Sequence, residues 1–173
     1  METIGQILTA TVGVIERVGV HNLTIDLVAA EAGVSKGGVL HHFPTKTALI
    51  VAAISQDMET LMMEIDETAG STVNFASALA QFARRIALEE GGVSPAFLVT
   101  AAEIPEAASV LATMFSTLVE RANKDGKAGS IDSTLVLFAS YGILISLGMK
   151  SFQPSAEQLA TLFEKLDSFA AKA

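Results

Sequence analysis

The fold of this chain is decided by residues 23–49, which read LTIDLVAAEAGVSKGGVLHHFPTKTAL. Two short helices are predicted within this stretch. Thr24 stands where a side-chain cap is needed before the first of them, and Gly33 is placed to end that helix in a left-handed conformation. Ser35 is placed to cap the second helix in the same way as Thr24 caps the first. The stretch therefore predicts two helices joined by a tight turn.

The spacing of small and apolar residues in this stretch is typical of a helix-turn-helix. Such a motif needs a small residue where the helices cross, a glycine in the turn and an apolar residue that ties the second helix to the core. Ala29, Gly33 and Val39 meet these needs. The second helix, residues 35–43, would then be a DNA-recognition helix. Its first turn would offer four residues to a DNA groove: Ser35, Lys36, Gly37 and Gly38. On spacing alone, a plain turn between two structural helices remains the alternative.

The rest of the chain predicts helices almost throughout, because apolar residues recur every three to four positions. Glycines, prolines and polar caps divide the pattern into about nine helices, with no strand and no internal repeat. The predicted fold class is all-α. Outside the motif, the first expected helix starts near Ile4 and stops at Gly19. The following helices are expected from Thr45 to about Thr68, over Asn74–Glu89, from Ser94–Pro95 onward, from Pro105 to about Asn123 and over Ser130–Met149. A capping box at residues 155–158 predicts the start of a last helix.

Composition excludes several classes of protein. The chain has 173 residues, 50% of them hydrophobic and 17% charged, so it is long and apolar enough to bury a core. It has no cysteine, which removes disulfides, thiolate metal sites and cysteine nucleophiles. Its net charge of −8 argues against a broad basic face for non-specific nucleic-acid binding, but leaves room for a small local one.

No membrane, enzymatic or metal-dependent role is predicted. The acidic start, Met1-Glu2-Thr3, is unlike a signal peptide, and we interpret the uncharged run Ser133–Met149 as a helix buried in protein. A cytoplasmic location is expected. His41 and His42 are adjacent rather than four residues apart, so they do not form a metal pair, and no nucleophile with a nearby base stands out. We expect a non-enzyme without metal or cofactor.

Residues 23–49, which include the start of the helix expected from Thr45, resemble the DNA-binding domain of the tetracycline-repressor (TetR) family. The resemblance covers about the first 50 residues and combines the turn, the recognition helix and the segment FPTKTAL. It implies a homodimeric, ligand-responsive repressor, with a three-helix DNA-binding domain at residues 1–47 and an effector-binding and dimerisation domain at residues 48–173. The implied partners are a pseudo-palindromic double-stranded DNA operator and a small effector.

The resemblance also assigns roles to single residues. Thr24 and Lys46, each at the start of a helix, match usual phosphate contacts, and Lys36, Gly37 and His41 fall at groove-facing positions. Three positions depart from the usual pattern of the family. Its members usually have tyrosine where this chain has Leu40 and threonine where it has Gly38, and a basic residue is common where it has Asp26.

Charge bears on how well such a domain would bind DNA. The first 50 residues net −1, from Arg17, Lys36 and Lys46 against Glu2, Glu16, Asp26 and Glu31. Few phosphates can be neutralised by three cations, so the expected affinity is modest and weakly salt-dependent. Two alternatives stay open: the natural chain begins further upstream, or this protein is a dimeric helical ligand-binding protein whose DNA binding is weak or lost.

The remaining residues suggest an effector pocket and a dimer interface. Methionines and aromatics suit an apolar pocket with few polar anchors, and a plain hydrophobic core is the alternative. The candidate pocket residues are Met58, Met62, Phe82, Phe97, Met114, Phe115, Phe138 and Tyr141. Small residues in one helix and large ones in the next predict a four-helix bundle about a two-fold axis. The candidate interface residues are Ala139, Gly142, Ser146, Leu159, Leu162, Phe163, Leu166 and Phe169.

Overall fold

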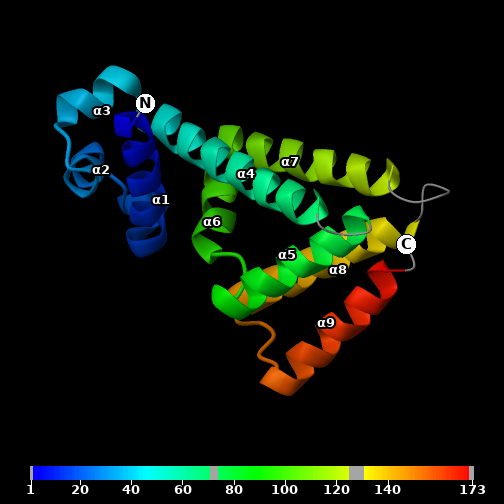
Figure 1. Cartoon of the computed structure of the whole chain (residues 1–173). Coiled ribbons are helices and arrows are strands. Elements are labelled where there is room, and N and C mark those ends of the chain that lie inside the picture. Colours follow the sequence, from blue (N-terminus) through cyan, green and yellow to red (C-terminus); the bar gives the residue numbers. More distant parts are fainter. Residues whose placement is uncertain (1, 71–73, 125–130, 172–173) are drawn as a thin grey trace. The chain divides into compact units, whose positions relative to one another are not determined.

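The computed structural model describes residues 2–70, 74–124 and 131–171, and all regular structure in these ranges is α-helical. The all-α prediction is therefore confirmed. The helices are α1 (Glu2–Asn22), α2 (Ile25–Ala32), α3 (Lys36–His42), α4 (Lys46–Gly70), α5 (Phe75–Glu89), α6 (Pro95–Glu103), α7 (Pro105–Lys124), α8 (Ile131–Gly148) and α9 (Ala156–Ala170) (Figure 1).

The helix boundaries follow the capping signals read from the sequence. The helix α1 is interrupted at Gly19, where φ is 79°, as the predicted stop requires, but a further turn continues to Asn22. The predicted capping box at the start of α9 is present, since Ser155 and Gln158 exchange hydrogen bonds. The polar sequence from Lys124 to Gly129 predicts a loop, and this segment lies almost wholly outside the described residues.

The chain divides into two compact units. Unit 1 comprises residues 1–60 and 96–113, and unit 2 comprises residues 61–95 and 114–173. The helices α4 and α7 contribute residues to both units. The division of function at residues 47 and 48 stays a prediction.

Unit 1 has a core of aliphatic side chains at the meeting point of its first helices. Val28 from α2 and Val39 from α3 are fully buried, as are Ile7 and Val14 from α1 and Leu49 from α4. Burying branched aliphatic side chains of this kind stabilises the unit by about 1.5–3 kcal/mol per residue. The core therefore fixes α2 and α3 against the rest of the unit.

Unit 2 is built on α5, which packs against both α8 and α9 (Figure 1). The side chain of Phe163 from α9 is 1% exposed and lies in the same cluster as Leu79 from α5 and Val136 from α8. Alanines on α5 permit this close packing, because five of its buried residues are Ala76, Ala78, Ala80, Ala83 and Ala87.

Two glycines allow the loop after α5 to touch the end of α8. The amide of Val93 donates a hydrogen bond to the Leu144 carbonyl oxygen over 3.0 Å. A Cβ added to Gly148 would collide with the backbone of Val93, and one added to Gly92 would collide with the backbone of α8. Gly92 also has a φ of 104°. Both positions therefore require glycine for the fold itself.

The helix α8 is apolar on all sides but is buried on only one. Ser133, Val136, Leu137, Ser140 and Leu144 face the core of unit 2. The opposite side forms what we call the α8 apolar face, whose members are exposed: Ile131, Leu135, Phe138, Ala139 and Gly142. The expectation that this segment is buried in protein thus holds for one side of the helix only.

By length and apolar character, α8 also meets the requirements of a membrane-crossing helix, with a mean hydropathy of 1.6. The pair α6 and α7 meets them only when it is taken as one span bent by 119°. Core helices of ordinary proteins meet the same requirements, so length and hydropathy do not distinguish a membrane-crossing helix from a core helix here.

The arginines of unit 2 pair with acidic side chains of α4 and α9. Arg85 contacts Glu64, Arg121 contacts Asp66, and Arg84 lies 3.3 Å from a carboxylate oxygen of Asp167. The guanidinium of Arg121 also lies 4.4 Å from the centre of the Phe75 ring. These charges have structural partners and form part of the surface of unit 2.

Candidate nucleic-acid interface

The start of α2 is a capped helix terminus with an exposed hydroxyl residue. The Thr24 side chain accepts a hydrogen bond from the Leu27 amide over 3.2 Å, and its backbone is extended. The first amides of a helix have no partner within the helix, and the helix dipole favours negative charge at this end. The predicted phosphate-contact residue Thr24 therefore stands at a terminus that suits an anion.

The turn between α2 and α3 has the backbone geometry that its glycine predicts. Gly33 adopts a left-handed φ of 67°, and the Val34 amide donates to the Ala29 carbonyl over 3.0 Å. Ala29 is 4% exposed and Val39 is completely buried. The small residue, the glycine and the apolar anchor thus occupy the places that a helix-turn-helix needs.

The first turn of α3 is capped and open toward solvent. Ser35 accepts a hydrogen bond from the Gly38 amide over 3.0 Å, so its hydroxyl serves as the N-cap of α3. A Cβ added to Gly37 would meet only the Ser35 hydroxyl at 3.9 Å, and one added to Gly38 would make ordinary contacts at 3.4 Å and beyond. The fold therefore does not require either glycine, although each costs about 1 kcal/mol in a helix interior relative to alanine.

The three cations of this region are held by partners within unit 1. The Lys36 ammonium lies 2.8 Å from a carboxylate oxygen of Asp26, and Arg17 lies 2.7 Å from one of Glu31. Lys46, at the start of α4, donates a hydrogen bond to the His21 carbonyl over 3.2 Å. The sequence showed Asp26 only as an unusual acidic residue; its contact with Lys36 depends on how α2 and α3 cross.

The other end of α3 exposes apolar and imidazole side chains. Leu40 is 39% exposed, and the rings of His41 and His42 lie 5.1 Å apart at the surface. The His42 ring is exposed, and its centre lies 6.4 Å from that of the Phe43 ring. No group of three metal-ligating side chains occurs in the described residues.

This combination of capped helices, turn glycine and buried anchor in an all-helical chain defines a helix-turn-helix motif. Residues 7–53 match the sequence model of a family described as bacterial regulatory proteins, tetR family. The regulator BetI of Vibrio campbellii is 39% identical over 62 residues, which cover 36% of this chain and 31% of BetI. The chain thus spans about a third of the length of that relative. Over these N-terminal residues the chain is similar to the TetR family of transcriptional regulators, as its sequence suggested.

Solved structures share the fold over nearly the whole chain. A transcriptional regulator from Rhodococcus sp. Rha1 has a TM-score of 0.71 at 22% identity, with 98% of this chain and 94% of that chain covered. FadR from Bacillus subtilis, solved in complex with stearoyl-CoA, has a TM-score of 0.64 at 16% identity, with 95% and 96% covered. Likeness at these identities concerns the fold alone.

The predicted effector residues are divided between the two units. Met58 and Phe97 are buried in unit 1, and the other six belong to unit 2. Phe115 gathers two of them, with its ring centre 5.4 Å from that of Phe138 and 5.0 Å from that of Tyr141. Phe82 is part of the core of unit 2, and Met62, Met114 and Phe115 pack against that core. Phe138 and Tyr141 are 52% and 40% exposed.

A hollow of about 420 Å³ lies elsewhere on unit 2. It is lined by residues from α9 and the segment before it, and none of the eight predicted pocket residues takes part. Its lining residues are Phe152, Glu157, Gln158, Thr161, Leu162 and Lys165. The effector pocket therefore stays a prediction.

The predicted interface residues divide into exposed and buried groups. Ala139 and Gly142 are exposed, Ser146 and Leu162 are half-buried, and Phe169 is 40% exposed. The other three lie in the core of their own subunit, because they pack against α5 and α8: Leu159, Phe163 and Leu166. A substitution at Phe163 would therefore disturb the core before it could test an interface.

Proposed function

We propose that this protein is a dimeric, ligand-responsive repressor that binds a pseudo-palindromic DNA operator through α3. The observation that carries the proposal is the first turn of α3, which is capped by Ser35 and bears two glycines that the fold does not need. Glycines at such positions leave the helix backbone free to approach the edges of bases in a major groove.

The residues around α3 take different roles in this proposal. Thr24 and Lys46 contact phosphates and fix the orientation of the domain. Gly37, Gly38, Leu40 and His41 lie on the groove side, where the exposed Leu40 side chain suits contact with a thymine methyl group. Lys36, in the first turn of α3, also lies on this side, and its ammonium would pair with a phosphate at the edge of the groove. Ser35 acts mainly as the cap that positions the turn.

Dimerisation supplies the second recognition helix. The α8 apolar face repeats at positions 131, 135, 138 and 142, which lie on one side of a helix. An exposed apolar face of this length suits burial against a second copy about a two-fold axis. Leu162 and Phe169 of α9, seven residues apart, extend the apolar surface offered by unit 2.

The effector in this proposal is small and mainly hydrophobic, uncharged or weakly acidic. Support comes from the apolar side chains of unit 2 and from Ser140, whose hydroxyl is buried without a hydrogen-bond partner in the described part of the chain. A buried unpaired hydroxyl is a ready anchor for a polar atom of a ligand. The protein would act in the cytoplasm without a cofactor or an enzymatic step.

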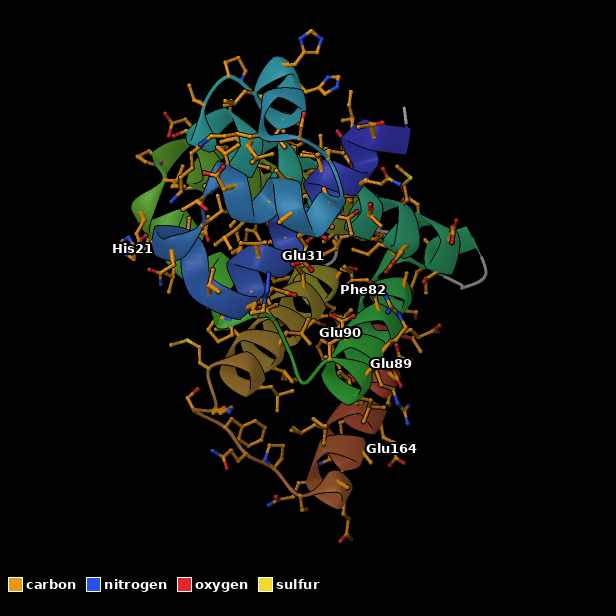
Figure 2. All side chains as sticks on the ribbon, turned by 90° about the vertical axis from the view of Figure 1, so that its left-hand side faces the viewer. His21, Glu31, Phe82, Glu89, Glu90 and Glu164 are labelled. Atoms are coloured by element: carbon orange, nitrogen blue, oxygen red, sulfur yellow. The ribbon has the colours of Figure 1, made fainter. Side chains whose placement is uncertain are left out.

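A contact within unit 1 offers a route by which an effector could change DNA binding. Glu103, at the end of α6, contacts the ring of His21 at the end of α1. Figure 2 labels His21. Lys46 bonds to the carbonyl of the same histidine. A ligand that favours a different placement of α6 would shift the support of Lys46, and so the population able to bind DNA.

The test of DNA binding is selection of duplexes from a randomised pool at low salt. We expect one pseudo-palindromic sequence to be enriched. Lys46→Ala should weaken binding to all sequences about equally, Gly38→Ala should alter the preferred sequence, and Lys165→Ala in α9 is the control that should do neither. If the pool yields no enriched duplex, the proposal of a DNA-binding repressor is wrong.

A second candidate function is a dimeric ligand-binding protein that does not bind DNA. It is favoured by one observation, namely that Arg17, Lys36 and Lys46 all have partners within unit 1. In this case no duplex would be enriched, while hydrophobic compounds would still raise the melting temperature. A thermal-shift screen of a metabolite and antibiotic library run beside the selection separates the two candidates.

A further inference from the structure

An ion pair joins the first turns of α2 and α3. The carboxylate of Asp26 and the ammonium of Lys36 are 2.8 Å apart, and their side chains are 66% and 56% exposed. The pair therefore lies at the surface on the side of the motif where both helices begin. A second pair on α2, between Glu31 and Arg17, has similar exposure and a distance of 2.7 Å. Figure 2 labels Glu31. This second pair differs in joining α2 to α1 rather than to the recognition helix.

Lys36 is the sole lysine or arginine of α3, which otherwise carries glycine, apolar and histidine residues. A lysine ammonium is a compact single positive charge, so an anion that already pairs with it reduces its net attraction for a second anion. A DNA phosphate and the Asp26 carboxylate therefore compete for it. The carboxylate also places a negative charge next to the approaching phosphate, which raises the free energy of the complex further.

We propose that Asp26 limits the affinity of this protein for DNA by holding Lys36 away from a phosphate. The inference rests on the proposed DNA-binding function and names the residue that regulates its strength. It explains why a recognition helix whose one lysine or arginine is Lys36 is only weakly attracted to DNA of any sequence. Binding then depends more on contacts to bases than on the phosphate backbone, which favours selective over non-specific binding.

The test compares Asp26→Asn with the matched control Glu31→Gln. Both changes remove one negative charge from α2, but only the first releases a cation on the recognition helix. With the duplex selected above, Asp26→Asn should bind about three- to fivefold more tightly at low salt. This change in affinity corresponds to the free energy that an exposed ion pair contributes. The slope of log K against log salt should steepen by about 1 because one more phosphate is neutralised. Glu31→Gln should leave that slope unchanged.

The same comparison in a Lys36→Ala background isolates the coupling between the two residues. There, Asp26→Asn should change affinity no more than Glu31→Gln does. If Asp26→Asn tightens binding equally with and without Lys36, the effect is general repulsion and the proposal is overturned. Weaker binding of Asp26→Asn to the selected duplex would also overturn it, because Asp26 would then be reading a base.

The outcome also separates this inference from the proposed function. If the unmodified protein binds the duplex but Asp26→Asn gives no gain, the inference fails and the repressor proposal stands. If only Asp26→Asn binds, the inference holds and Asp26 keeps binding below detection in the natural sequence. If neither binds any duplex, both fail. Circular dichroism melting of each variant checks that these exposed substitutions leave the fold intact.

Discussion

Both α3 and α8 carry residues that packing within the chain does not require. The residues on the two helices are of opposite kinds. The seven-residue α3 carries the exposed Gly37 and the half-buried Gly38, which leave a bare backbone. The eighteen-residue α8 exposes Leu135 and Phe138, at 50% and 52%, which leave a large apolar surface. A bare backbone suits a polar groove, whereas an apolar face suits a second apolar face.

Gly148 is an example of a glycine that the fold itself requires. Gly148, at the end of α8, has no room for a side chain because the backbone of Val93 fills the space. Comparing it with Gly37 separates a glycine that packing requires from one that packing does not require. The predictions below use such pairs, from the largest expected effect to the smallest.

The largest effect is expected at Gly148. Its replacement by alanine forces a Cβ into the Val93 backbone, which is less able to move than a side chain. Overpacking of this kind should lower the free energy of unfolding by about 3 kcal/mol. Urea unfolding followed by circular dichroism measures this loss. A wild-type midpoint for Gly148→Ala would contradict the close approach of α8 to the loop after α5.

The second effect concerns the α8 apolar face. Leu135→Asp should raise the dissociation constant of the proposed dimer at least about thirtyfold, roughly 2 kcal/mol, because a carboxylate would be buried between the subunits. Leu88→Asp is the matched control, since Leu88 is 62% exposed on α5 of the same unit. Analytical ultracentrifugation at micromolar concentration should show monomers for the first variant and dimers for the second. A monomeric unmodified protein would refute the dimer itself.

The motif around α3 could be predicted from the sequence because its geometry is set by local chemistry. The caps Thr24 and Ser35 and the left-handed Gly33 each act within four residues along the chain. Such signals do not depend on what packs against the motif. The end of α2 and the start of α9 could be predicted for the same reason.

The faces of α8 and α9 could not be predicted in the same way. The helix α8 is apolar all round, so its sequence has no period that separates the buried side from the exposed one. On α9, Phe163 and Phe169 look alike in sequence, yet one is 1% exposed and the other 40%. Packing against α5 makes that difference, and it depends on residues about eighty positions away. The contact between Asp26 and Lys36 escaped prediction because it too depends on tertiary packing.

The third prediction compares two serine caps. Ser35 caps α3 and Ser155 caps α9, each by accepting a hydrogen bond from an amide three residues on. Replacing either serine by alanine should lower the free energy of unfolding by about 1 kcal/mol. Only Ser35→Ala should also weaken binding to the selected duplex, because α3 would lose its defined first turn. Equal binding losses in both variants would show that the effect comes from stability and not from the interface.

The smallest effect, and the sharpest test of the comparison, is expected at Gly37. Alanine fits there, since the nearest atom to an added Cβ is the Ser35 hydroxyl at 3.9 Å. The free energy of unfolding should therefore rise by about 0.5–1 kcal/mol, as it does when alanine replaces glycine in a helix. Gly13→Ala in α1 is the matched control, because nothing lies within 4 Å of its added Cβ. Both variants should be more stable in thermal and urea unfolding, but Gly37→Ala alone should bind the selected duplex less tightly, since its methyl group would hold the α3 backbone away from the base edges. If Gly37→Ala gains stability and keeps full affinity, the bare backbone of α3 does not serve the groove.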